Sequence, residues 1–214
     1  MKGKIFNAQE VQAIIAGTKT IFREVLKPRI KVENYKLDDG SGIGMEILLE
    51  ECPYQVGQKI FVKESFSIFA SQVSYKQGLV GAERYFWKPA QQMKQEHSRL
   101  TLEITDIKVE RLKDISEEDA INEGVNKLFT EEEMKHVLRV HQIEKNDTYK
   151  NYLWHGHIGR TITKKQSDEW EYQCSAYEKA KDSFFSLWNA THKKPEEKFE
   201  ANPFVWVVDF KINK

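Results

Sequence analysis

The chain has 214 residues, enough to bury a substantial core in one domain, with or without an insertion. Its 33 Lys and Arg residues are balanced by 33 Asp and Glu residues, so overall charge does not attract it to nucleic acid. The two cysteines lie far apart and form no CxxC motif, which argues against a disulfide framework and a zinc knuckle. The sequence begins without an apolar leader and has no apolar run of membrane-spanning length, so we expect a cytoplasmic protein without a membrane partner.

The start of the chain predicts an amphipathic helix followed by a basic turn. Asn7 and Glu10 form a capping-box pattern at the beginning of the helix. The sequence GTKTIFR at residues 17–23 then places Lys19 and Arg23 within one short loop or strand start. This cluster suits an anionic or polar ligand, such as a phosphate or the edge of a nucleobase. The alternative is a solvated basic face that acidic segments elsewhere balance.

Most of the remaining chain is rich in β-forming residues. We expect strands at residues 43–49, 59–66, 99–112 and 204–212, and a hairpin within residues 73–87. In the third of these strands the alternation changes phase at Asp106, which predicts a bulge or bend of the kind found in small barrels.

Helices are fewer. Ser116 and Asp119 are in capping positions for a short helix that Gly124 ends. Residues 126–182 have no strong periodicity at first and predict a partly helical insertion, with a capped helix after Thr130; spacing in its last part predicts a helix at about 168–190. The strands do not alternate strictly with helices, so we predict a single α+β domain over residues 1–214, a compact mixed β-barrel with peripheral helices.

Seven short motifs follow one another along the chain: AGTKT (16–20), GQKIFVKESF (57–66), WKP (87–89), LEITDIKVERL (102–112), ISEEDAINEGV (115–125), FSLWN (185–189) and NPFVWV (202–207). In this order they resemble the ASCH domain family, and most closely its phage and prophage branch. The resemblance implies a PUA-like β-barrel with a cleft beside the first helix, suited to RNA or a nucleotide. The segment at about 126–182 lies outside the resemblance.

Some bacterial relatives in that family hydrolyse the amide bond of acylated cytidines such as N4-acetylcytidine. Their key groups are a lysine after the glycine turn, a threonine three residues beyond it, and a glutamate near the end of the short helix. Here the resemblance places Lys19 and Glu123 at the first and last positions, as candidate catalytic residues, while Phe22 occupies the threonine position and removes the candidate nucleophile. A water activated between Lys19 and Glu123 would then have to react. The alternative is that the two residues form only a structural salt bridge.

A second group of candidates comes from the strand at 59–66. Alternation places Lys63 and Glu64 on opposite faces, so one of them faces the cleft, and we expect Glu64 to pair with Arg23. Phe22 and Trp87 are candidates for stacking on a base, although such aromatic residues also form cores. The candidate ligand-binding residues are therefore Thr20, Phe22, Arg23, Lys63, Glu64 and Trp87.

The histidine pair His155 and His157 lies in a segment with no third ligand placed by the fold, so we predict no metal site and no cofactor. The first functional hypothesis is a module that binds RNA or a modified nucleotide. An amidohydrolase using Lys19 and Glu123 is the alternative, and a non-catalytic protein-interaction adaptor is the second alternative. The sequence leaves the oligomeric state open.

Overall fold

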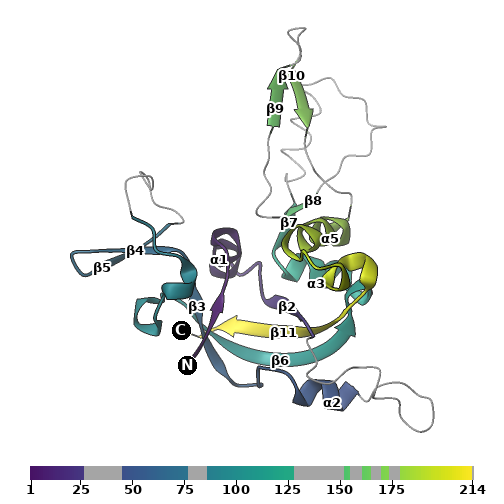
Figure 1. The fold of residues 1–214 in the computed structure, drawn as a ribbon, viewed down its shortest axis with the longest axis horizontal. Coiled ribbons are helices and arrows are strands. Elements are labelled where there is room, and N and C mark those ends of the chain that lie inside the picture. The colour runs from purple at the N-terminus through teal and green to yellow at the C-terminus, as the bar shows by residue number, and fades with distance from the viewer. Residues whose placement is uncertain are drawn as a thin grey trace.

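The computed structural model describes residues 1–26, 45–76, 86–127, 152–154, 161–164, 170–173 and 179–213. It confirms a mixed α+β fold, centred on a five-stranded sheet (Figure 1). In spatial order the strands are β1 (Lys2–Ile5), β3 (Lys59–Lys63), β6 (Thr101–Arg111), β11 (Phe204–Ile212) and β2 (Ile21–Val25). β1 pairs with β3 in parallel and the other neighbours are antiparallel. Among the described residues this sheet is open, with β1 and β2 at its edges, so these strands do not form the closed barrel expected from the sequence.

Three two-stranded ribbons and four α-helices complete the described structure. The ribbons are β4 (Phe66–Phe69) with β5 (Gln72–Tyr75), β7 (Val125–Lys127) with β8 (Tyr152–Trp154), and β9 (Thr161–Lys164) with β10 (Trp170–Gln173). The helices are α1 (Ala8–Ile15), α2 (Met45–Glu50), α3 (Glu117–Asn122) and α5 (Ala180–Thr191). Short 3-10 helices occur at Ala90–Gln92, Gln95–His97, Leu112–Asp114, Pro195–Glu197 and Phe199–Ala201. Within the described part of the chain, every helix is too short or too polar to span a bilayer.

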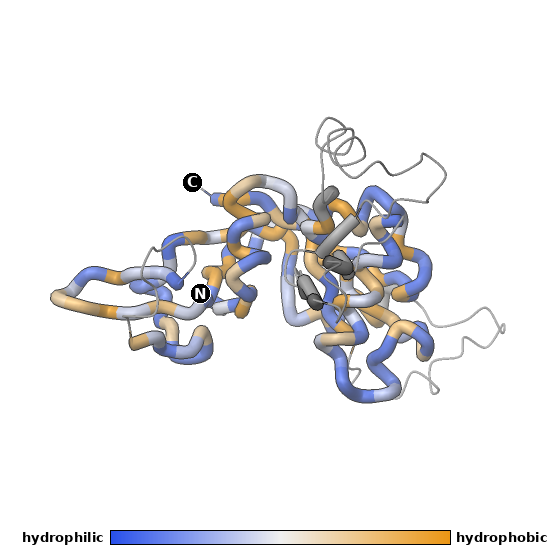
Figure 2. The backbone as a smooth tube through the Cα atoms, turned by 90° about the horizontal axis from the view of Figure 1, so that it is seen from above, coloured by the Kyte–Doolittle hydropathy of each residue, from blue (hydrophilic) through white to orange (hydrophobic). Residues whose placement is uncertain are grey.

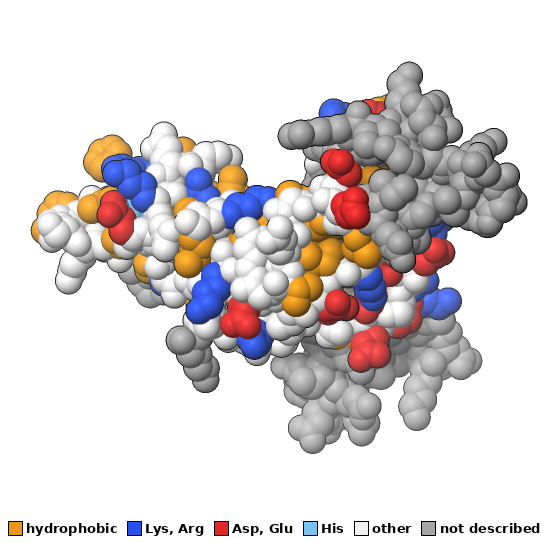
Figure 3. Space-filling view, turned by 90° about the horizontal axis from the view of Figure 1, so that it is seen from below, with side chains coloured by type: hydrophobic (Ala, Val, Ile, Leu, Met, Phe, Trp, Pro, Cys, Tyr) orange, Lys and Arg blue, Asp and Glu red, His pale blue; other side chains and the backbone are white. Residues whose placement is uncertain are grey.

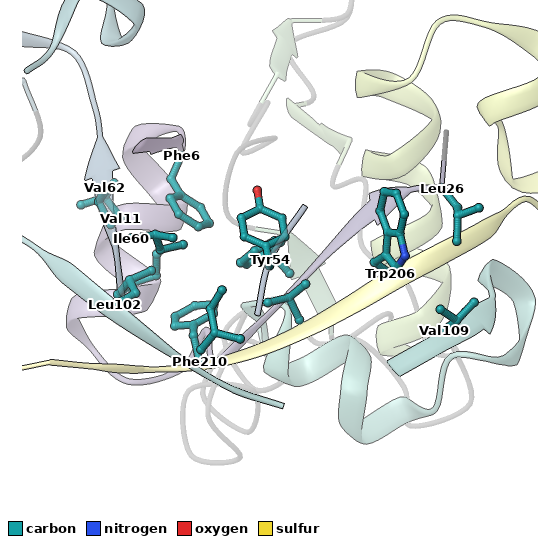
Figure 4. Close-up of a cluster of buried hydrophobic side chains, with 14 of the residues drawn as sticks. Phe6, Val11, Leu26, Tyr54, Ile60, Val62, Leu102, Val109, Trp206 and Phe210 are labelled. Carbon is teal, nitrogen blue, oxygen red and sulfur yellow. The ribbon is translucent and has the colours of Figure 1, made fainter. Parts of the chain in front are cut away.

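The side chains of the central sheet alternate between two hydrophobic clusters. In β11, Trp206, Val208 and Phe210 join the first cluster, which α1 also lines (Figure 4). Val205 and Val207 join the second cluster, together with residues of α3 and α5. Successive residues of a strand point to opposite faces, so one strand supplies both clusters.

Several local predictions are confirmed. Asn7 and Glu10 form a reciprocal capping box at α1, and the Ser116 hydroxyl accepts a hydrogen bond from the backbone N–H of Asp119 at 2.9 Å. The terminal strand spans Phe204–Ile212 as expected. The pairing of β6 with β11 shifts between Asp209 and Phe210, opposite Asp106 and Ile104, so Thr105 is the extra residue of the predicted bulge.

Two predicted elements are wrong. The strand expected at 43–49 is replaced, from Met45 onwards, by helix α2, because a short apolar run containing Met, Glu and Leu also suits a helix. The helix expected at 168–190 begins only at Ala180, since Trp170–Gln173 is strand β10, in keeping with the strand preference of Trp and Tyr.

The hairpin is also displaced from its predicted position. Val73 belongs to β5, which pairs back onto β4 through a turn at Ala70 and Ser71, both with positive φ (47° and 67°). Residues 77–85 of the predicted hairpin, the helix expected after Thr130 and the His155–His157 pair lie outside the described residues.

Candidate functional site

Lys19 and Glu123 meet as the sequence predicts, between the end of α1 and the end of α3. Gly17 turns the chain with a φ of 75°, and Lys19 then forms an isolated β-bridge with Glu123. The Lys19 Nζ donates to the Glu123 carboxylate Oε2 at 2.7 Å and to its backbone carbonyl at 2.9 Å. Gly124, with a φ of 95°, reverses the chain directly after Glu123. The pair is buried, with 2% of Lys19 and 3% of Glu123 exposed.

Arg23 binds the other oxygen of the same carboxylate. Its Nη1 donates to Glu123 Oε1 at 3.0 Å, while its Nη2 donates to Glu110 at 2.7 Å and to Asp119 at 2.9 Å. A guanidinium has five N–H donors in a fixed fork, so one Arg23 side chain holds carboxylates from β6 and α3 together. Lys108 completes the group with a contact of 3.2 Å to Asp119.

These side chains form what we call the ion cluster, in which three cations balance three carboxylates: Lys19, Arg23, Lys108, Glu110, Asp119 and Glu123. Its centre is shielded from solvent. Arg23 is 7% exposed. Burial alone would lower the pKa of its guanidinium, but Glu123 and Glu110 together raise that pKa above its ordinary value. The guanidinium therefore stays charged, and its net interaction with the carboxylates is favourable.

Strand alternation explains which side chains reach the cluster. Ile21 and Arg23 point from β2 toward the side of α3 and α5, whereas Phe22 points into the first hydrophobic cluster. Phe22 is 3% exposed and packs edge-to-face against Phe6 and Tyr54, with ring-centroid distances of 5.8 and 5.3 Å. Phe22 is thus part of the core and forms one wall of the neighbouring cavity.

A cavity of about 210 Å³ lies against the ion cluster. Its polar lining includes Lys19, Arg23 and Glu123, and α5 contributes Phe184 and Trp188 to its apolar wall. A larger, neighbouring cavity of about 800 Å³ shares Lys4, Arg23 and His192 with it and adds the carboxylates of Glu24, Glu50, Glu51 and Glu197. We call the smaller space the base cavity.

The other predicted site residues lie elsewhere. The expected Arg23–Glu64 pair is wrong: Glu64 accepts two hydrogen bonds from the Arg99 guanidinium, at 2.8 and 2.9 Å, and Arg23 is occupied by the ion cluster. Lys63 donates to the backbone carbonyl of Gln91 at 2.7 Å. Thr20, Lys63, Glu64 and Trp87 are not among the residues that line the base cavity.

Sequence reasoning missed most of the acidic partners. Asp119 and Glu123 are four residues apart, which places two carboxylates on one side of α3 and its C-terminal end. Lys108 and Glu110 are two residues apart in a strand and therefore share a face. These two spacings are the sequence features that could have indicated the clustering of charged side chains. The apolar residues Phe184 and Trp188 of α5 are buried and also line the base cavity.

A second acidic contact lies beside the ion cluster, at the bulge. Asp209 of β11 is paired directly with Asp106 of β6. Burial raises the pKa of the Asp209 carboxyl above its ordinary value; Lys108 opposes this rise, and Asp106 and Asp119 add to it. Arg23 lowers this pKa as Lys108 does, so burial is the main cause of the rise and the neighbouring charges act in both directions.

Comparisons with known proteins add little. No family model matches the chain, and no curated protein matches it. Among solved structures, the chain is similar to a crystal structure of a DUF984 protein from Enterococcus faecalis V583, at 11% sequence identity and a TM-score of 0.37. The match covers 99% of this chain and 80% of that chain. The site is accordingly interpreted from its own geometry.

Proposed function

We propose that the chain binds a nucleobase, carried by a nucleoside, a nucleotide or an RNA strand, in the base cavity. The observation that carries this proposal is the Glu123 carboxylate, held by two separate cations at the edge of a partly aromatic cavity. An ionised carboxylate has about four acceptor positions, and Lys19 and Arg23 occupy two of those of Glu123. The Glu123 carboxylate can therefore accept a further hydrogen bond from an N–H group of a ligand.

The charge of the surroundings favours the base over the phosphate as the group that enters. Four glutamates line the larger neighbouring cavity, and in the base cavity Lys19 and Arg23 are already paired with Glu123. A carboxylate is a natural acceptor for an exocyclic amino group such as N4 of cytosine. The rings of Phe184 and Trp188 offer apolar area beside it.

Isothermal titration with cytidine, uridine and N4-acetylcytidine tests this proposal. We expect binding of a cytidine-type base and its loss in Glu123→Gln, which keeps the shape but removes the charge. Glu118→Gln is the matched control, because Glu118 is exposed on the same helix and does not line the cavity. Equal binding by both variants would refute the proposed role of Glu123.

A second candidate function, hydrolysis of an acylated cytidine, is favoured by the 2.7 Å contact between Lys19 and Glu123. In this proposal a water molecule attacks the acyl carbonyl carbon while Glu123 accepts its proton and Lys19 stabilises the oxyanion. The bond from the acyl carbon to N4 then breaks, N4 takes the proton, and a carboxylic acid and cytidine are released.

Water is the nucleophile in this scheme because protein hydroxyls are poorly placed. Phe22 supplies none, and the Thr191 hydroxyl, which lines the base cavity, donates to backbone carbonyls of its own helix at 3.0 and 3.1 Å. Incubation with N4-acetylcytidine, followed by chromatography for cytidine, tests the scheme. Cytidine release that disappears in Lys19→Ala supports hydrolysis; binding without release leaves the first proposal alone.

The relationship to the ASCH family, with its PUA-like fold and a phage or prophage origin, is part of the same proposal. It is supported by the order of the seven motifs and by the position of Lys19 and Glu123 at a cavity beside α1.

A further inference from the structure

The hairpin of β4 and β5 extends away from the rest of the described chain (Figure 2). We call residues 63–76 and 86–99, which contain this hairpin and the segment packed beside it, the arm. Two of its phenylalanines are unusually open to solvent: Phe69 is 79% exposed and Phe86 is 94% exposed. Single exposed apolar residues are common, so these two rings become informative only together with the charge around them.

Apolar residues lie on both sides of β4. Ile68, which is 37% exposed, is paired with Val73 in the hairpin. On the other edge of β4, Phe66 forms an isolated antiparallel bridge with Lys88, and Phe86 precedes Lys88 by two residues. The bridge therefore attaches the segment that carries Phe86 to the hairpin that carries Phe69.

The same arm is positively charged. In residues 63–76 and 86–99 there are five Lys or Arg residues and two Glu residues. Lys76 and Lys88 form no ion pair within the described ranges. Figure 3 shows blue and orange side chains side by side at the left end of the molecule, with a red one among them. The charge of the arm is therefore opposite in sign to that of the larger cavity beside Arg23, whose lining contains more carboxylates than cations.

A third cavity, of about 390 Å³, connects the arm to the first turn of α1. Ser65 and Lys76 line it from the arm, and Phe6 and Asn7 line it from the start of α1. Phe6 and Asn7 also line the base cavity. The two cavities are therefore neighbours, with the start of α1 in the lining of both.

We propose that the arm binds single-stranded nucleic acid, with unpaired bases stacked on Phe69 and Phe86 and phosphates close to Lys76 and Lys88. Open aromatic faces among unpaired lysines are the combination that single strands need, because stacking serves any base and the lysines follow the backbone. This inference rests on the proposed function in one respect: the strand would deliver one of its bases to the base cavity.

Fluorescence anisotropy of a labelled twelve-nucleotide oligouridine RNA with the full chain tests the inference. Stacking contributes about 1–3 kcal/mol per base, so Phe69→Ala combined with Phe86→Ala should weaken binding by about tenfold or more. Val56→Ala is the control, because Val56 is 63% exposed outside the arm and should leave affinity unchanged. Lys88→Gln should weaken binding and reduce the salt dependence by about one unit of slope.

The outcomes separate this inference from the proposed function. Titration of the double phenylalanine variant with cytidine should match that of the native protein, because neither residue lines the base cavity. Cytidine binding without RNA binding would overturn the inference and leave the base cavity in place. Native RNA affinity in the double variant, with a change from dimer to monomer in size-exclusion chromatography, would overturn it in favour of a protein contact.

Discussion

The ammonium of Lys19 is bound twice by Glu123, once by its carboxylate at 2.7 Å and once by its backbone carbonyl at 2.9 Å. The two residues are 104 positions apart in the sequence. The double contact fixes the carboxylate relative to the end of α3, because the side chain and the main chain of one residue hold the same cation. The site is therefore preorganised before a ligand arrives.

Replacing Lys19 by Met should lower the free energy of unfolding by about 3 kcal/mol, because removing one member of a buried pair leaves the other uncompensated. Urea denaturation of Lys19→Met, Glu123→Gln and the double variant measures the coupling. We expect the double variant to lose at least ~1 kcal/mol less than the sum of the single losses. Simple additivity of the two losses would contradict a direct interaction.

Arg23→Lys should also be destabilising, by about 2 kcal/mol, although the charge is kept. One ammonium cannot reproduce the fork that contacts Glu110, Asp119 and Glu123 at once. The measurement is again the urea midpoint, compared at low and high salt. A loss in the free energy of unfolding smaller than ~0.5 kcal/mol would show that a lysine ammonium can replace the guanidinium in the ion cluster.

The sequence allowed good prediction where the determining contacts are local. The capping box of Asn7 and Glu10 involves residues three apart, and the bulge near Asp106 follows from a break in alternation within one strand. The partner of Glu64 was not predictable in this way. Alternation indicates which face a side chain takes, but Arg99 reaches Glu64 through the folding of an arm whose hairpin was misplaced.

The candidate site was predicted only in part, because most of its contacts join residues that are far apart in the sequence. The pairing of Lys19 with Glu123 came from a family resemblance, and the sequence placed Arg23 nearby on the same loop. The carboxylates of Glu110 and Asp119 were missed, because they come from elements that meet β2 only in three dimensions. Long-range polar contacts carry little sequence periodicity, so patterns alone do not reveal them.

Phe22→Thr, which supplies the hydroxyl found in the amidohydrolase pattern, should cost about 3 kcal/mol of stability. The first hydrophobic cluster is packed around this ring, which Phe6, Tyr54 and Phe210 contact. Phe22→Leu, which keeps most of the apolar volume, should lose clearly less. Calorimetric melting of the two variants checks the order; equal losses would contradict a core role for the aromatic ring.

Asp209→Asn should stabilise the protein at pH 8 by about 0.5 kcal/mol, because it removes an ionised carboxyl that burial disfavours and that is paired with the like charge of Asp106 across β6 and β11. The raised pKa of Asp209 means that the folded state holds its proton more tightly than the unfolded state. The advantage of the variant should therefore shrink as the pH falls through that pKa, when the native carboxyl also becomes neutral. Urea midpoints at pH 8 and pH 4 measure the difference in stability between the variant and the native protein. An undiminished gain at pH 4 would contradict a raised pKa for Asp209.

The alternation of β2 has a consequence for how this protein can change over generations. Phe22 and Arg23 are adjacent in the sequence, yet Phe22 belongs to the first hydrophobic cluster and Arg23 to the ion cluster. Losing or gaining a single residue between Gly17 and Ile21 would exchange their positions, placing a guanidinium among aromatic rings and a phenyl ring among carboxylates. Lineages that retain this fold should accordingly keep the length of that stretch constant and keep Lys19 within it, and sequencing of functional variants from a library with random insertions there would reveal this.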